Sequence, residues 1–539
     1  MILALRLTDL EGPFRKMVRD GTRPVAGGDG RFGQLDLIGE PLRLMLFTTY
    51  QFLIGFLPAA LAGFFALRAF GLHKASITFL LICSLAFYAI GSLVHLGLLA
   101  GSIGVNYFLG RTIAQERPYR RLLLIGGVGF NLALIFWFKY LDFTLENLAP
   151  LTGTTHTLRN IILPLGISFF TFQQIGYLVD CYTDKIPEQN FRQYALFVSF
   201  FPQLIAGPIV HHSHTRPQFA ALARPGFDLN ALSYGVMIFA LGLGKKALVA
   251  DPIARAIDPI YTMAASGEPL TVALSIAAIL GYTLQIYFDF SGYCDMAIGL
   301  GLMFGIRLPI NFNSPYKSAS IIEFWKRWHI TLSKFLRDYV YIPLGGNRAG
   351  EVMRLRNIFL TMLIGGVWHG AAWTFIIWGA LHATAITANH ATRMVWPGLD
   401  RINSAGPKLL KRAALLAFIM GSWVYFRSPS VDAAHTVFAG LLGTGLGDIS
   451  LSSPPALTDY TVPVQIYLFM GFASLIALFA PNSLEITGYK ENWKEPLPNL
   501  SGPAPRMELT PSAALTTAIL FTGGLAVAWQ PSIFIYFNF

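Results

Sequence analysis

Apolar stretches alternate with short polar links along most of the chain. An α-helix needs about 20 mainly apolar residues to cross the hydrocarbon core of a bilayer. Several stretches are interrupted by Gly or Pro, which is typical of broken helices buried in protein. The pattern predicts an all-α polytopic membrane protein with about 11 to 13 membrane-embedded helices. They are expected near residues 48–70, 76–90, 92–109, 121–141, 161–180, 194–210, 231–250, 270–288, 292–306, 357–388, 411–426, 462–480 and 513–535.

Residues 318–341 have a different pattern. Their apolar positions form one helical stripe, with charged residues on the opposite side. The stripe consists of Ile321, Trp325, Trp328, Leu332, Phe335 and Tyr339. Ser320 and Glu323 form a capping box that predicts the start of the helix. Basic residues on one side and Trp and Phe on the other predict an amphipathic helix that lies in the membrane interface, where it would serve as an anchor.

Composition supports a membrane protein. Apolar residues make up 54% of the chain and charged residues 13%, whereas a soluble domain carries about 25% charged residues. This excludes an ordinary soluble enzyme, and 14% aromatic residues exclude low-complexity disorder. The net charge of +11 indicates cytoplasmic loops that face anionic membrane lipid. No nucleic-acid partner is expected, because the basic residues lie between apolar spans.

Two further features bound the organisation of the chain. Residues 1–44 are basic and contain a Gly-rich run, so we expect a poorly ordered extension. An alternative translation start is expected at Met45. A membrane domain is expected over residues 45–539. Three widely spaced cysteines give neither a disulfide framework nor a zinc pattern and are expected to be buried thiols.

Two histidines are the candidate catalytic residues. His369 lies within the apolar stretch 357–388, and an ionisable residue at such depth is by default a functional candidate. Small residues on either side of it would let another helix or a ligand approach closely. His329 lies at the edge of the apolar stripe and is expected to point partly into the protein. For each, the alternative is a neutral, hydrogen-bonded structural histidine, which is also what we expect of His382.

Other polar residues within the apolar stretches are expected to be structural. Asp289 precedes Ser291 and Gly292, where we expect a helix break that its side chain caps. Lys139 is expected to lie at the membrane interface. No serine-elbow, P-loop, HExxH or paired-cysteine motif occurs in the sequence. Two deep histidines favour proton transfer on a hydroxyl over metal binding, so no metal is expected.

Several strings resemble one known family. They include RWHITLS (327–333), LGGNR (344–348) and WHG (368–370), with longer similar segments at 161–182, 200–210, 284–316 and 365–382. The chain resembles the membrane-bound O-acyltransferase (MBOAT) family, and within it the bacterial AlgI-like branch associated with alginate O-acetylation. The start at 45–58 and the end at 532–539 also resemble that branch, whereas residues 1–44 have no counterpart in it.

The resemblance implies a ring of helices around a central tunnel. It implies acetyl-CoA as a cytoplasmic donor, and transfer of the acetyl group across the bacterial inner membrane for O-acetylation of an exported polysaccharide. A periplasmic SGNH-hydrolase-like acetyltransferase is the implied partner. The family's intramembrane histidine corresponds to His369 and its second histidine to His329. Asn347 and Arg348 would lie beside the cytoplasmic opening and contact the donor.

Two other functions remain open on the sequence. A transporter or flippase would move an acetyl or glycan intermediate without cleaving a thioester. A scaffold would only anchor a periplasmic transferase. The sequence does not identify the final acceptor.

Overall fold

The computed structural model describes residues 45–115, 117–153, 161–183, 190–226, 228–348, 350–396, 405–444, 462–492, 494, 510–528 and 534–535. All of them belong to one compact unit, residues 43–539. The N-terminal extension expected at residues 1–44 lies outside the described residues, and the domain division stays a prediction.

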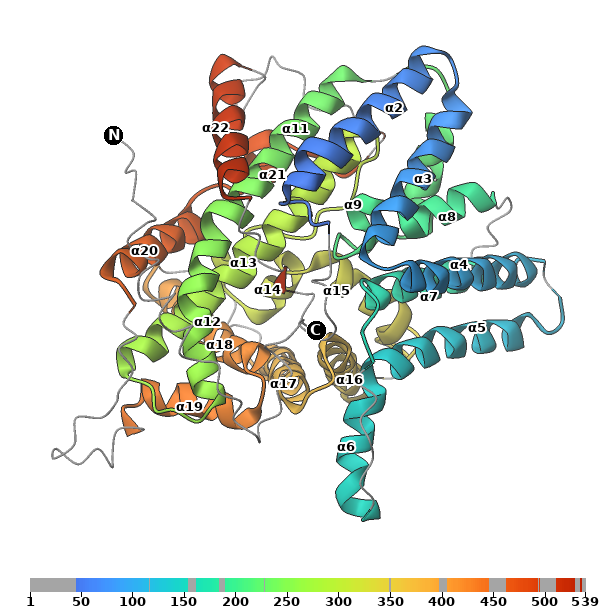
Figure 1. The fold of residues 1–539 in the computed structure, drawn as a ribbon. Coiled ribbons are helices and arrows are strands. Elements are labelled where there is room, and N and C mark those ends of the chain that lie inside the picture. The colour runs from blue at the N-terminus through green and yellow to red at the C-terminus, as the bar shows by residue number, and fades with distance from the viewer. Residues whose placement is uncertain are drawn as a thin grey trace. The chain divides into compact units, whose positions relative to one another are not determined.

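The prediction of an all-helical protein is confirmed, because helices are the only regular elements in the described parts of the chain (Figure 1). Between Gln51 and Met303 they are η2 (Gln51–Phe56), α2 (Leu57–Ala69), α3 (His73–Gly91), α4 (Leu93–Ile113), α5 (Arg120–Ile135), η3 (Phe136–Tyr140), α6 (Leu141–Thr152), α7 (Ile167–Thr183), α8 (Phe191–Ser199), α9 (Phe201–Leu204), α10 (His212–Leu222), α11 (Leu229–Leu243), η4 (Gly244–Ala250), α12 (Asp251–Ala265) and α13 (Val272–Met303).

The second half of the chain contains shorter helices around a long hairpin. They are η5 (Pro315–Lys317), α14 (Ile321–Arg327), α15 (Ile330–Leu336), η6 (Arg337–Tyr341), α16 (Glu351–His369), α17 (Trp373–Val395), α18 (Ala405–Arg427), α19 (Val431–Leu441), α20 (Val464–Phe479), α21 (Ser483–Thr487) and α22 (Pro511–Val527).

The described residues contain 7 helical segments long and apolar enough to cross a membrane: 51–69, 73–91, 93–113, 120–152, 229–265, 272–303 and 408–427. The helices α20 and α22 are apolar but shorter. Fewer segments meet this criterion than the number of embedded helices expected, because several apolar stretches are divided into short helices. The multi-pass membrane character that the sequence predicts is nevertheless clear.

The helices near the N-terminus carry large apolar side chains on their outer surfaces. Phe108 on α4, Leu122 on α5 and Leu151 on α6 are 65%, 69% and 82% exposed. Such side chains are costly in water and favourable against lipid tails. These helices therefore have the composition of lipid-facing elements.

The long helix α13 is the centre of the packing. Every residue from Gly281 to Met303 is buried, and α13 contacts α11, α12, α18, α19 and α20. A helix that is apolar on all sides is one that protein surrounds. The sequence predicted two spans here, 270–288 and 292–306. That prediction is wrong, because Ser291 and Gly292 continue the helix without a break.

The predicted capping role of Asp289 is wrong for the same reason. Asp289 lies inside α13, where one carboxylate oxygen is 2.6 Å from Nζ of Lys246. The same ammonium lies 2.6 Å from the carboxylate of Asp251. The other oxygen of Asp289 accepts a hydrogen bond of 2.9 Å from the backbone N–H of Ile535. A buried charge is stable only when it is paired in this way.

Glycines allow α11 and α13 to pack with their backbones in contact (Figure 1). A β-carbon at Gly235 would lie 2.7 Å from the carbonyl oxygen of Gly299. A β-carbon at Gly292 would lie 2.8 Å from the carbonyl oxygen of Gly242. Close backbone approach at small residues is the usual basis of tight helix packing in membranes. We call these four glycines the glycine seam.

Candidate active site

His369 is the last residue of α16, at the turn of a helical hairpin. Residues 370–372 are extended or bent, and α17 begins at Trp373. The two helices pack closely, since a β-carbon at Gly366 would lie 2.6 Å from the Cα of Gly379. The His369 side chain is 4% exposed. The imidazole is therefore buried at the tip of the hairpin.

The prediction of one continuous helix over 357–388 is wrong. Its composition is apolar throughout, and hydropathy alone does not distinguish one span from two helices joined by a turn. Gly370 begins the turn, and any side chain there would collide with the ring of Phe375. Only glycine fits at this position while the Phe375 ring stays where it is.

The tip is held by side chains from η3. Nζ of Lys139 donates to the carbonyl oxygens of Trp368 and His369 at 2.7 and 2.8 Å. Tyr140 donates from its hydroxyl to the carbonyl of Val367 at 2.5 Å. The last carbonyls of a helix lack partners within the helix, and a cation near them is favourable. Lys139 is thus a site residue that the sequence placed at the membrane interface. The signal that could have identified it is a lysine in the apolar run FWFKY.

His329 lies between two short helices. The prediction of one helix over residues 318–341 is wrong, because α14 ends at Arg327 and His329 has a φ of 44°, which is in the left-handed region. The expected start is confirmed, since the Ser320 hydroxyl accepts from the N–H of Glu323 at 3.2 Å. A residue other than glycine in this conformation is strained, and such strain is common at functional sites.

The apolar stripe that was expected to face the interface faces protein instead. Its residues from Ile321 to Phe335 are 1–8% exposed: Ile321, Trp325, Trp328, Leu332 and Phe335. Helical periodicity shows that one side of a segment is buried, but it does not show whether lipid or protein covers that side. His329 is completely buried, at 0% exposure.

The two candidate histidines come together from these separate elements. Their ring centroids are 6.4 Å apart, and the ring planes are inclined at 54°. The Trp368 ring lies within 5.0 Å of His369 and 6.5 Å of His329. Phe290 packs edge-on against His329 at 4.9 Å, and Trp378 against His369 at 5.1 Å. The result is a pair of imidazoles in an aromatic, water-poor environment that disfavours the charged form of each ring.

Asn347 and Arg348 are not in contact with this pair. Both are exposed in the turn between η6 and α16, where the Tyr341 hydroxyl donates to the side-chain oxygen of Asn347. They lie on the same continuous segment that leads from α15 to α16. Their predicted role in donor binding stays a prediction.

His382 makes hydrogen bonds typical of a structural histidine. Its Nδ1 accepts from Nε1 of Trp325 at 3.2 Å, and its Nε2 lies 3.0 Å from the Ser422 hydroxyl. The Ser422 hydroxyl donates to a backbone carbonyl, so it accepts from Nε2–H. Both ring nitrogens are satisfied, as a structural role requires.

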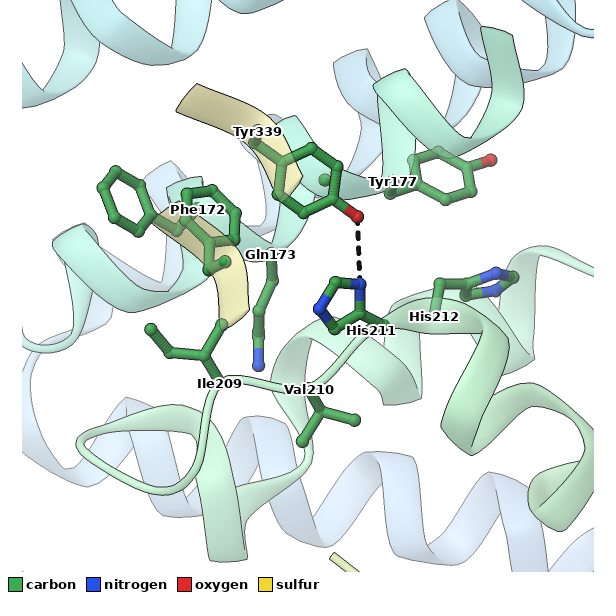
Figure 2. Close-up of a pocket in the computed structure, with 10 residues that line it drawn as sticks. Phe172, Gln173, Tyr177, Ile209, Val210, His211, His212 and Tyr339 are labelled. Atoms are coloured by element: carbon green, nitrogen blue, oxygen red, sulfur yellow. Dashed lines mark hydrogen bonds between the residues drawn. The ribbon is translucent and has the colours of Figure 1, made fainter. Parts of the chain in front are cut away.

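A small recess lies beside the aromatic side chains that pack against Trp368 (Figure 2). About 190 Å³ of space, part of it open to the surroundings, is lined by Phe172, Gln173, His211, His212, Phe335 and Tyr339. Phe172 stacks on Trp368 at 4.9 Å and on Phe335 at 4.3 Å, so one wall of the recess packs against the residue next to His369.

A hydrogen-bonded chain crosses the recess. The Tyr339 hydroxyl donates to Asp180 at 2.7 Å. It accepts from Nδ1 of His211 at 3.0 Å (Figure 2). His211 lies outside the membrane-spanning segments, and burial lowers its pKa. Sequence reasoning missed this chain, because its members come from three distant segments without a shared motif.

No cluster of three side chains suited to hold a metal ion occurs in the described ranges. The cysteine prediction is confirmed for Cys181 and Cys294, which are buried and not in disulfides, whereas Cys83 is half-buried.

Comparison with known proteins identifies the family. The sequence model of the membrane-bound O-acyltransferase family matches residues 182–397. The chain is 44% identical over 440 residues to a peptidoglycan O-acetyltransferase of Helicobacter pylori, covering 76% of this chain and 81% of the relative. The chain belongs to the membrane-bound O-acyltransferase family.

Other MBOAT relatives include probable alginate O-acetylases AlgI. That of Pseudomonas putida is 38% identical, over 80% of this chain and 87% of its own. That of Pseudomonas aeruginosa is 36% identical, over 90% and 93% of the two chains. A teichoic acid D-alanyltransferase of Streptococcus thermophilus is 28% identical over 47% of this chain and 62% of its own.

This MBOAT chain is therefore a multi-pass acyltransferase. The matched segment contains both histidines of the close pair and the Asn347–Arg348 turn. It does not contain Lys139, which reaches the tip from outside it.

Proposed function

We propose that this MBOAT protein is an O-acetyltransferase of the bacterial inner membrane. It takes an acetyl group from cytoplasmic acetyl-CoA and passes it across the membrane for O-acetylation of an exported polysaccharide. A periplasmic SGNH-hydrolase-like acetyltransferase completes the transfer. The observation that supports this most is the pair of buried imidazoles with centroids 6.4 Å apart, within the segment that matches an acyltransferase family.

In the proposed reaction, His369 acts as the general base. Its neutral ring accepts the proton of the acceptor hydroxyl as the oxygen attacks the thioester carbonyl. The C–S bond breaks, the acetyl group is bonded to oxygen, and the proton passes from the imidazolium to the leaving thiolate. A base with a low proton affinity in an apolar site stays in its active, neutral form at neutral pH.

The other parts of the site have supporting roles in this proposal. His329 positions the donor or orients His369. Arg348 and Asn347, exposed at the turn before α16, attract and bind the anionic part of the donor. The final acceptor, which receives the acetyl group from the periplasmic partner, is an exported polysaccharide, alginate-like or of the peptidoglycan type. This agrees with the names of two relatives, a peptidoglycan O-acetyltransferase and a probable alginate O-acetylase.

The test uses membranes of the producing bacterium, which contain the chain together with its partners. Radiolabelled acetyl-CoA is supplied on the cytoplasmic side, and thiol release and O-acetyl label on polysaccharide are measured. Removal of a general base typically costs about 10²–10⁴-fold, so His369→Ala should lower both quantities by that factor. His382→Gln is the matched control, because His382 is also buried and contacts the same Trp378 ring.

Two outcomes would refute the proposal. Label that crosses the membrane with its thioester intact would indicate a transporter or flippase. Wild-type thiol release and glycan label in His369→Ala membranes would indicate a scaffold for another transferase.

A further inference from the structure

Asn311 contacts the imidazole of His329 through its side-chain oxygen. Nδ1 of His329 lies 3.1 Å from Oδ1 of Asn311. The same oxygen is 3.2 Å from the backbone nitrogen and 2.9 Å from the hydroxyl of Thr331. Asn311 is completely buried, at 0% exposure. Three hydrogen-bonding groups therefore converge on one end of a buried amide.

The neighbours decide which end of this amide is the oxygen. A backbone N–H is a donor only, so the side-chain atom of Asn311 that faces the N–H of Thr331 must accept. The Thr331 hydroxyl accepts from the N–H of Ile209 at 3.0 Å, which leaves its own hydrogen for Asn311. The amide nitrogen lies 3.2 Å from the sulfur of Cys294. These contacts exclude the flipped orientation of the amide.

The orientation of Asn311 in turn determines the tautomer of His329. Because Oδ1 is an acceptor, the ring atom that bonds to it must carry the hydrogen. A neutral imidazole has one N–H and one lone pair. With the hydrogen on Nδ1, the lone pair of His329 is on Nε2.

We propose that Asn311 is a positioning residue that fixes His329 as the Nδ1–H tautomer, so that Nε2 is the nitrogen of the His329 ring that accepts a hydrogen bond from the donor or from His369. The expected effect of Asn311 on turnover rests on the proposed function. The tautomer of His329 does not depend on it. It assigns a role to a residue outside the pair. In many enzymes, a hydrogen bond to one nitrogen of a histidine ring determines whether the other nitrogen carries a hydrogen or a lone pair.

The backbone around His329 supports the same assignment. Asn311 also accepts through its backbone carbonyl, from the N–H of Ile330 at 3.0 Å. The two residues that follow the left-handed His329, Ile330 and Thr331, are thus tied to Asn311. A strained conformation of this kind persists only where its surroundings hold it. Asn311 therefore holds the backbone next to His329 and determines which nitrogen of its ring carries the hydrogen.

The direct test is nitrogen NMR of the full chain in lipid nanodiscs with isotopically labelled histidine. His329→Gln identifies the His329 signals by difference. The wild type should show a neutral His329 with hydrogen on Nδ1. Asn311→Asp keeps the accepting oxygen and should keep the Nδ1–H. Asn311→Leu removes the acceptor and should lose the preference for Nδ1–H.

The matched control is Asn106→Leu. Asn106 is also 0% exposed and bonds to Asn131 between α4 and α5. The control removes an equally buried amide and should leave both the His329 signals and turnover unchanged. Asn311→Leu should lower turnover by about 10²-fold or more, with Asn311→Asp restoring much of the loss.

Two results would overturn the proposal. Hydrogen on Nε2 of His329 in the wild type would contradict it whatever the enzyme does. An Asn311→Leu protein that keeps the Nδ1–H tautomer would reduce Asn311 to a structural residue. If the tautomer behaves as expected but thiol release is independent of both histidines, the positioning role stands and the proposed function fails.

Discussion

Replacement of Lys139 by methionine tests whether the hairpin tip must be held for catalysis. Methionine keeps the length and apolar stem of lysine but has no ammonium. The change removes the two hydrogen bonds from Nζ to the carbonyls of Trp368 and His369, at 2.7 and 2.8 Å. It leaves every residue of the histidine pair in place.

The magnitude follows from those two bonds. A hydrogen bond to a charged group contributes about 1.5–3 kcal/mol. Removal of a half-buried ammonium also removes its desolvation cost, which offsets part of the loss. We expect a net destabilisation of about 2–3 kcal/mol, located at the last turn of α16. Because a displacement of about 1 Å at a reacting group can cost 10²-fold in rate, turnover should fall by a similar factor.

The assay combines thiol release from acetyl-CoA in membranes with thermal unfolding of the purified protein. Tyr140→Phe is the comparison, because it removes one neutral bond to Val367, 2.5 Å long, on the same helix end. It should cost only about 0.5–1.5 kcal/mol and little activity. A Lys139→Met protein that turns over donor at the wild-type rate would show that the tip needs no external support.

Three further changes test other parts of the structure. Gly366→Val places a side chain against the backbone of Gly379, where even a β-carbon would be 2.6 Å from Cα. The hairpin should therefore separate, and thiol release should be lost while the protein still inserts. A fully active variant would contradict this packing. Lys246→Met leaves Asp289 without its buried cation at 2.6 Å and should lower the free energy of unfolding by about 3–5 kcal/mol. The loss is measured as a lower melting temperature, and a second change, Asp289→Asn, should partly restore it. Arg348→Gln, at an exposed position, should raise KM for acetyl-CoA with little change in kcat, and an unchanged KM would remove Arg348 from donor binding.

Much of the architecture is predictable from hydropathy, because lipid selects long apolar helices. What hydropathy does not predict is where an apolar stretch turns. Residues 357–388 form a hairpin and residues 272–303 form one helix, although both stretches contain glycines. The presence of glycine therefore does not by itself predict a break. Gly370 lies beside an aromatic ring, whereas Gly292 lies against a neighbouring backbone.

The candidate site was predictable in part. Depth in an apolar stretch singled out His369, and a position at the edge of the helical stripe singled out His329. The distance between their rings depends on long-range packing that no spacing encodes. The residues that hold them were harder still to recognise. Lys139 acts on a carbonyl 230 residues away in sequence and Asn311 on a ring 18 residues away. Neither contact is marked by a motif, and each residue looks like an ordinary polar residue when considered alone.

The glycine seam has a consequence for how the protein moves. Where two backbones touch, neither helix is able to slide or rotate past the other without atomic overlap, so α11 and α13 must travel as one rigid body. Opening for substrate then has to come from elements that surround this fixed pair. A cross-link between α11 and α13 should therefore leave turnover intact.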